Sequence, residues 1–150
     1  MILYANRIGI WTTGTFILGF PYETREQMER TIKFAIDSDL DLAFFYCSTP
    51  FPGTDLKEIY EREGIEVPED VSLSGGGVAS LTMCAEEIVE VRNRAESRFI
   101  KSRALRPWKL FTKVRSLEDL RYVLRIILFT IRALRRGAGS NVPVRLVQRR

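Results

Sequence analysis

The first sixty residues repeat one pattern of apolar and polar positions. An apolar, β-branched run at residues 11–18 ends in Gly19-Phe20-Pro21 and predicts a strand. Thr24-Arg25-Glu26-Gln27 follows with the pattern of a reciprocally capped helix start. The apolar residues after it recur at the spacing of one buried helix face: Met28, Ile32, Ala35 and Ile36. We expect this helix to end between residues 37 and 40.

The pattern then recurs. Residues 42–47 are continuously apolar and predict a strand that is buried on both faces. Pro50-Phe51-Pro52-Gly53 ends this strand, and Thr54 is placed to cap a second helix. The inner face of that helix would consist of Leu56, Ile59 and Tyr60. Gly64 then lies where a glycine commonly follows a helix.

Strand, helix, strand, helix with apolar strands predicts an α/β fold with a parallel sheet and a right-handed crossover. Two such strands are not stable alone, because each needs neighbours at its edges and helices on both faces. Either residues 1–9 contain further strands, or the rest of the sheet belongs to chain outside this sequence. We favour the second interpretation.

Beyond the repeat, residues 66–77 are acidic and then rich in glycine and serine, which indicates a linker or a loop over the site. Thr82 is placed to open a helix with one apolar face, Ile88, Val91, Ala95 and Phe99. Ser116, with Asp119 three residues on, predicts another helix. Its apolar stripe is Leu120, Val123, Leu124, Ile127, Leu128, Ile131 and Leu134, beside Arg121, Arg125, Arg132 and Arg135.

The charge changes sign along the chain. Residues 1–91 hold 6 Lys/Arg and 16 Asp/Glu, a net charge of −10, whereas residues 92–150 hold 17 and 3, a net charge of +14. The basic part would suit a nucleic acid, a membrane surface, or the acidic body of the same protein, and we favour the last. The arginines lack interleaved aromatic residues or a recognised motif, so nucleic-acid binding ranks lowest.

The absence of histidine and the small number of cysteines limit the kinds of metal or disulfide site that this sequence can form. The chain has no histidine and two isolated cysteines, Cys47 and Cys84, which predicts neither a disulfide framework nor a zinc site. A reducing, cytoplasmic setting fits this usage. No run approaches the roughly 20 apolar residues of a membrane span, and no secretory leader is evident.

Two motifs carry a family resemblance. Residues 15–24, Thr-Phe-Ile-Leu-Gly-Phe-Pro-Tyr-Glu-Thr, resemble the glycine-rich strand and turn late in the barrel of radical S-adenosylmethionine (radical SAM) enzymes. Residues 48–54, Ser-Thr-Pro-Phe-Pro-Gly-Thr, are similar to the turn after the next strand in the cobalamin-binding branch, which includes magnesium-protoporphyrin cyclase-like and methyltransferase-like proteins. The order and separation of the motifs also match. The resemblance covers residues 2–66, and extends loosely to residue 136.

The resemblance implies the last units of a partial (β/α)6 TIM-like barrel followed by a basic helical extension. Residues 12–18 and 42–48 would be the fifth and sixth strands. The barrel portion would occupy residues 1–66, a linker residues 67–81, the extension residues 82–136, and a disordered tail residues 137–150. A complete member would place a cobalamin domain and the first barrel units before this segment.

The cluster-binding loop of the family, C-x3-C-x2-C, is missing from this sequence. Cys47 and Cys84 are 37 positions apart and cannot replace it. By resemblance, S-adenosylmethionine is the cofactor to which this segment contributes. The [4Fe-4S] cluster and cobalamin are expected only in a full-length enzyme, ligated by other residues.

The resemblance also implies site residues at the C-terminal ends of the two strands. Phe16, Ile17, Leu18 and Gly19 would lie beside the adenine and ribose of S-adenosylmethionine, with Gly19 allowing close approach of the backbone. Glu23 would occupy the acidic position of the motif. Tyr46, Ser48 and Thr49 would contact the adenine or face the substrate.

Simpler interpretations stand beside these. Gly19-Phe20-Pro21 is an adequate turn in any α/β protein, and Glu23 could act only on the dipole of the following helix. The phenylalanines at 44, 45 and 51 are expected in the core, and Cys47 is expected to be a small buried apolar residue.

We therefore expect a fragment of a radical SAM enzyme that is not catalytic alone and needs a missing N-terminal barrel half or a partner chain. A truncated gene, a split gene, a partial gene model and an internal start would all give such a fragment. The exposed sheet would make the isolated chain poorly soluble or oligomeric. The alternative is a small scaffold or membrane-peripheral protein that acts through residues 116–136.

Overall fold

The computed structural model describes residues 1–67 and 77–106, together with 113, 114, 117, 118, 120, 121, 123–125 and 128. Outside these residues lie 68–76, which are most of the expected linker at 67–81, the apolar residues Ile127, Ile131 and Leu134, and the expected tail at 137–150. The elements, in chain order, are α1 (Ile2–Arg7), β1 (Thr13–Leu18), α2 (Arg25–Asp37), β2 (Leu42–Cys47), α3 (Asp55–Arg62) and α4 (Ala85–Ala104).

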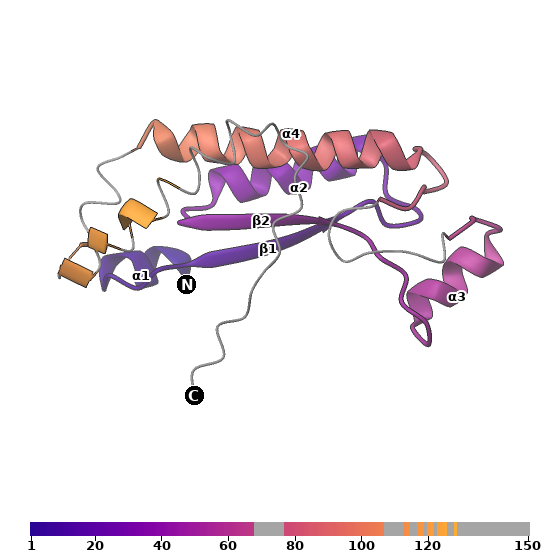
Figure 1. The fold of residues 1–150 in the computed structure, drawn as a ribbon, viewed down its shortest axis with the longest axis horizontal. Coiled ribbons are helices and arrows are strands. Elements are labelled where there is room, and N and C mark those ends of the chain that lie inside the picture. The colour runs from indigo at the N-terminus through magenta and orange to yellow at the C-terminus, as the bar shows by residue number, and fades with distance from the viewer. Residues whose placement is uncertain are drawn as a thin grey trace.

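The two strands pair in parallel, and α2 connects the end of β1 to the start of β2, as the sequence pattern predicted (Figure 1). Their register pairs Thr13 with Leu42 and Leu18 with Cys47. Residues 2–7 form a helix, so the idea that residues 1–9 contain further strands is wrong. Within the described residues the chain is a mixed α/β unit with a two-stranded parallel sheet, and its place at the end of a partial (β/α)6 barrel remains a prediction.

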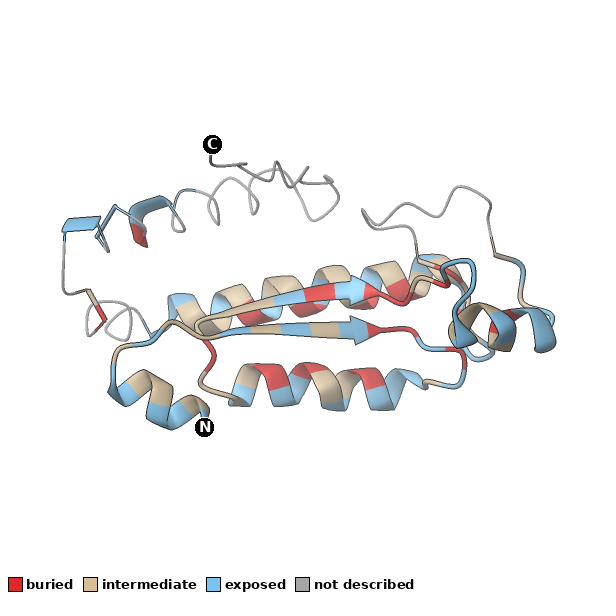
Figure 2. Ribbon diagram, turned by 90° about the horizontal axis from the view of Figure 1, so that it is seen from below, coloured by how far each residue is buried: buried red, intermediate tan, exposed pale blue. Residues whose placement is uncertain are grey.

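The core lies between the sheet and helices α2 and α4, which run side by side over the same face of the sheet (Figures 1 and 2). Phe45 is 2% exposed and stacks on Phe16 with ring centroids 5.3 Å apart. The edge of the Phe99 ring also meets Phe45. The expected inner faces of both helices are confirmed, and their buried residues are Met28, Ile32, Ala35, Ile88, Val91, Ala95 and Phe99.

The other face of the sheet is open. Phe44, Tyr46 and Ile17 are 44%, 46% and 47% exposed, whereas the residues between them point towards α2 and α4. The expectation that residues 42–47 are buried on both faces is therefore wrong. Phe44 and Phe51 are not core residues, since Phe51 is also 42% exposed. An apolar run indicates that both faces of a strand could be buried, but burial requires other elements to pack on each face. The described helices pack on one face of this sheet.

Local side-chain chemistry sets the helix ends. Thr24 and Gln27 form the predicted capping box at the start of α2. The hydroxyl of Thr54 accepts from the Lys57 amide at the start of α3. Helix α4 begins at Ala85, three residues after the predicted Thr82, because the Thr82 hydroxyl instead donates to the Glu23 carbonyl at 2.8 Å.

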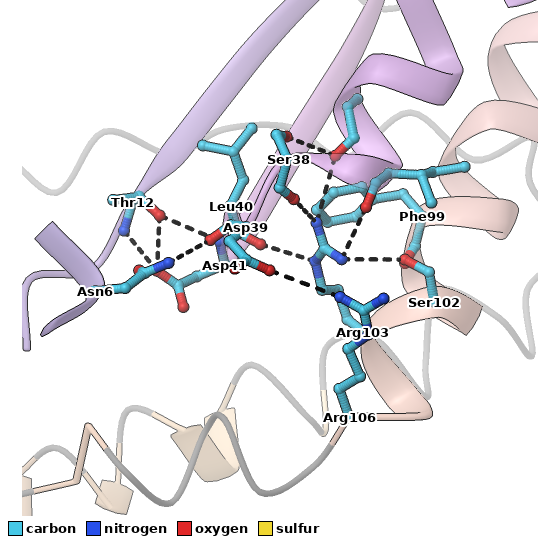
Figure 3. A network of polar contacts seen from close by, with 12 residues as sticks. Asn6, Thr12, Ser38, Asp39, Leu40, Asp41, Phe99, Ser102, Arg103 and Arg106 are labelled. Atoms are coloured by element: carbon cyan, nitrogen blue, oxygen red, sulfur yellow. Dashed lines mark hydrogen bonds and ion pairs between the residues drawn. The ribbon is translucent and has the colours of Figure 1, made fainter. Parts of the chain in front are cut away.

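The start of the basic extension packs on the acidic body. Arg103 of α4 donates to backbone carbonyls at the end of α2 and in the following loop, those of Ala35, Ile36, Ser38 and Leu40 (Figure 3). The Ala35 and Ile36 carbonyls belong to the last turn of α2, where no further helical amide follows to bond them, and those of Ser38 and Leu40 lie beyond the helix. Burial lowers the pKa of the Arg103 guanidinium, yet five N–H groups in a planar fork suit this task. Arg98 pairs with Glu29, and Arg106 pairs with Asp39.

A buried ion pair adds to this attachment. Lys113 is 5% exposed, and its ammonium group donates to the Asp41 carboxylate at 2.6 Å, to the Asn6 side chain and to the Ile10 carbonyl. The same Asp41 oxygen accepts from the amide and the hydroxyl of Thr12 (Figure 3). In these described contacts the basic part of the chain packs on the acidic body, which is the interpretation of the charge pattern that we favoured.

Candidate functional site

The C-terminal ends of β1 and β2 meet at one edge of the sheet, as the strand directions require. The Ser48 amide donates to the Leu18 carbonyl at 2.7 Å, which continues the pairing one residue beyond the strands. Ser48 is 2% exposed, and the Thr49 hydroxyl donates to the Cys47 carbonyl. Ser48 is thus fixed against the end of β1, whereas Thr49 bonds back to its own strand.

The turn after β1 is organised around Gly19. Its φ of +84° belongs to the region that favours glycine. Its amide donates to the Glu23 carboxylate at 2.7 Å, and its carbonyl accepts from the Tyr60 hydroxyl at 3.3 Å. A Cβ at position 19 would lie 2.6 Å from Cγ2 of Ile88 in α4. In this structure the close approach that needs a glycine is to α4, and Glu23 holds the turn by accepting backbone hydrogen bonds.

Side-chain alternation divides the remaining predicted residues between the two faces. Phe16 contacts Phe45 and Phe34, and Leu18 is fully buried, so both belong to the core. Ile17 and Tyr46 are opposite each other in the sheet register, and both are exposed. Among the predicted site residues, these two have side chains on the exposed side of the sheet. We call this surface the open sheet face, formed by Thr13, Thr15, Ile17, Phe44 and Tyr46.

Sequence reasoning missed three members of this face, Thr13, Thr15 and Phe44. Thr15 precedes Ile17 by two residues, and Phe44 precedes Tyr46 by two, so the period of a strand places each pair on one side. The pairing of Thr15 with Phe44 confirms that all four lie together. Had strand parity been applied to the predicted residues, it would have separated Ile17 and Tyr46 from Phe16 and Leu18.

The two cysteines lie in different environments. Cys47 is buried beneath α4, while Cys84 is exposed and caps the N-terminus of that helix. Burial raises the pKa of the Cys47 thiol, an effect that the nearby Arg92 partly offsets. Within the part of the chain that the structure describes, no three His, Cys, Asp or Glu side chains gather into a possible metal site. These thiols do not fit a cluster that takes three cysteine ligands.

We expect iodoacetamide to modify Cys84 rapidly and Cys47 slowly in the folded chain, because the thiolate is the nucleophile and Cys47 is both buried and protonated. Peptide mapping by mass spectrometry at mildly alkaline pH would measure both rates. In concentrated urea the two cysteines should react alike. Equal rates without urea would contradict the placement of Cys47 under α4.

None of the described helices is both long and apolar enough to cross a bilayer. This result bears on spanning helices only.

Comparison with known proteins gives partial matches. No protein-family model matches the sequence. An uncharacterized methyltransferase of Pyrococcus horikoshii is 54% identical over 54 residues, which are 36% of this chain and 12% of that protein. The tRNA-2-methylthio-N(6)-dimethylallyladenosine synthase of Neisseria meningitidis is 36% identical over 59 residues, 39% of this chain and 13% of the synthase. The Vibrio vulnificus synthase of the same name is 28% identical over 106 residues, 65% of this chain and 22% of the synthase.

The chain therefore spans between 12% and 22% of the length of these relatives. Their names describe methyl and methylthio chemistry. The matches support a relation to radical SAM proteins in general, over part of the chain, and they do not distinguish the cobalamin-binding branch.

Proposed function

We propose that this chain is the last part of a radical SAM barrel of the cobalamin-binding branch and supplies one wall of the S-adenosylmethionine pocket. The observation that carries the proposal is the pairing of Ile17 with Tyr46 on the open sheet face, at the C-terminal ends of two parallel strands. In barrels of parallel strands, sites are built at this end. Similarity to proteins named for methyl and methylthio chemistry supports the radical SAM part of this proposal.

The open sheet face suits a flat, partly apolar ligand. The Tyr46 ring and the Ile17 side chain offer apolar surface for an adenine, and the Thr15 hydroxyl adds a polar group. Phe16 and Leu18 anchor the same strand in the core from behind. Gly19 and Glu23 would not touch the ligand and would instead position the end of β1, because the hydrogen bond between them fixes the turn that follows the strand.

The missing barrel half would cover the open sheet face and pair with the strand edges. Such strands need neighbours, and the chain is a small share of its relatives' length. When bound to a [4Fe-4S] cluster elsewhere in the enzyme, S-adenosylmethionine would supply a 5′-deoxyadenosyl radical after reductive cleavage. Residues of this chain would bind and orient the nucleoside. No cobalamin contact is assigned to any residue here.

The first experiment uses the chain as it stands. After anaerobic reconstitution with iron and sulfide, we expect no stoichiometric cluster and no 5′-deoxyadenosine under reductant, since Cys47 and Cys84 do not fit a three-thiolate site. Iron quantification and product chromatography would measure this. A stable cluster with turnover would contradict the assignment of a fragment.

A chimera then tests the pocket. The matched 54 residues of the Pyrococcus relative would be replaced by those of this chain, and S-adenosylmethionine binding measured by equilibrium dialysis. Tyr46→Ala in the chimera should weaken binding, whereas Phe34→Ala should not, because Phe34 is exposed on α2 behind the sheet. Equal effects of the two substitutions in a folded chimera would overturn the role of the open sheet face.

A further inference from the structure

Leucine side chains are exposed along the described part of the predicted helix at 116–136. Residues 117, 118, 120, 121, 123–125 and 128 are helical. The leucines among them are Leu117, Leu120, Leu124 and Leu128, which are 77%, 37%, 50% and 53% exposed. We call these four side chains the leucine face. Isolated exposed leucines are ordinary, but four at helical spacing form a continuous apolar strip.

The geometry of a helix places other residue types at the borders of this strip. At 3.6 residues per turn, the leucine face occupies an arc of about 80° around the helix axis. Arg121 and Arg125 are exposed and follow directly on one side of that arc. Val123 lies on the other side and is only 3% exposed. The segment therefore packs through Val123, while its leucines remain on the surface.

Charge selects the partner. Residues 92–150 carry 17 basic and 3 acidic residues, so the segment lies in a strongly basic part of the chain. A helix that places leucines in the acyl boundary of a membrane and arginines at its edge gains from both contacts, because long basic side chains reach up to the headgroups. A phosphate backbone of a nucleic acid would engage the arginines but would leave the leucines in water.

We propose that the leucine face, with Arg121 and Arg125 beside it, binds an anionic membrane surface. This inference is independent of the barrel and its cofactor. It follows from the exposure of the four leucines and from the arginines at their border. The rest of the chain would then lie outside the bilayer, attached to its surface through this helix.

The test is co-sedimentation of the full chain with vesicles of equal parts phosphatidylglycerol and phosphatidylcholine. Leu124→Glu should weaken partitioning by roughly tenfold or more, since burying one leucine is worth about that factor. Leu81→Glu is the matched control, because Leu81 is also 50% exposed and lies in the loop before α4. Circular dichroism would establish that both variants retain the wild-type helix content.

Added salt and the double variant Arg121→Gln, Arg125→Gln should also reduce binding, as expected for basic residues near anionic lipid. Several results would overturn the proposal. These are no sedimentation of the wild type at low salt, equal binding to pure phosphatidylcholine, or equal losses for Leu124→Glu and Leu81→Glu. A dimer that Leu124→Glu dissociates, without vesicle binding, would assign the leucine face to a second copy. RNA binding that Leu124→Glu leaves intact, again without vesicle binding, would assign the segment to a nucleic acid.

Discussion

Gly19→Ala should lower the free energy of unfolding by about 2–4 kcal/mol, even though it adds one methyl group. Two costs add at this position. A side chain is disfavoured at a φ of +84°, by roughly 1–2 kcal/mol. The new Cβ would also lie 2.6 Å from Cγ2 of Ile88, so α4 would have to shift away from the sheet. Urea unfolding followed by circular dichroism would measure the change.

Gly64→Ala is the matched control. Its φ of +68° imposes a similar backbone cost, but no atom lies within 4 Å of the added Cβ. The difference between the two variants therefore isolates the contact with Ile88. The destabilisation caused by Gly19→Ala should be smaller in an Ile88→Ala background than in the wild type, because the shorter side chain makes room, although Ile88→Ala itself lowers stability by truncating a buried residue. If Gly19→Ala and Gly64→Ala had equal effects, the close approach of α4 to the turn would be wrong.

Lys113→Met should destabilise the chain by about 3–5 kcal/mol, because it leaves the Asp41 carboxylate buried without its counter-charge. The side chains of Lys113 and Asp41 are only 4% and 8% exposed. The loss would also leave Asn6 and the Ile10 carbonyl without this donor. The same unfolding titration would measure the change, with the variant's native spectrum recorded first.

Lys33→Met provides the comparison for an exposed pair. Lys33 and Asp37 lie one turn apart on α2, with side chains 73% and 58% exposed, so this substitution should change stability by less than about 1 kcal/mol. Replacing Asp41 and Lys113 together by apolar residues should cost less than Lys113→Met alone, since no unpaired charge remains. Equal effects of Lys113→Met and Lys33→Met would show that Lys113 is not buried against Asp41.

Local sequence patterns predicted the N-terminal unit well. The apolar periods of β1, α2, β2 and α3 and the capping pattern at Thr24 lie within windows of a few residues, so they could be read directly. The observed start of α4 differs from the predicted one because the Thr82 hydroxyl bonds to Glu23, which is 59 positions away in the sequence. The ion pair between Asp41 and Lys113 spans 72 positions, and no short-range pattern indicates such a contact.

The candidate site was predicted in part. The resemblance singled out segments that include Ile17 and Tyr46, which the structure places opposite each other, and their contact with a ligand stays a prediction. It did not indicate that Phe16 and Leu18 turn towards the helices, which follows from strand parity. It also gave a ligand-based reason for Gly19, whereas the neighbour that requires a glycine here is Ile88. That neighbour comes from an element 69 residues later, so the motif alone could not reveal it.

The contacts of Arg103 bear on how the chain folds as it leaves the ribosome. The strands and α2 are synthesised first, and yet the last carbonyls of α2 and the helix-covered face of the sheet obtain their partners from α4. Until α4 has emerged, the nascent unit exposes apolar surface and unpaired carbonyls. Its closure is a long-range step between segments more than sixty residues apart. Folding of the N-terminal unit is therefore coupled to completion of α4.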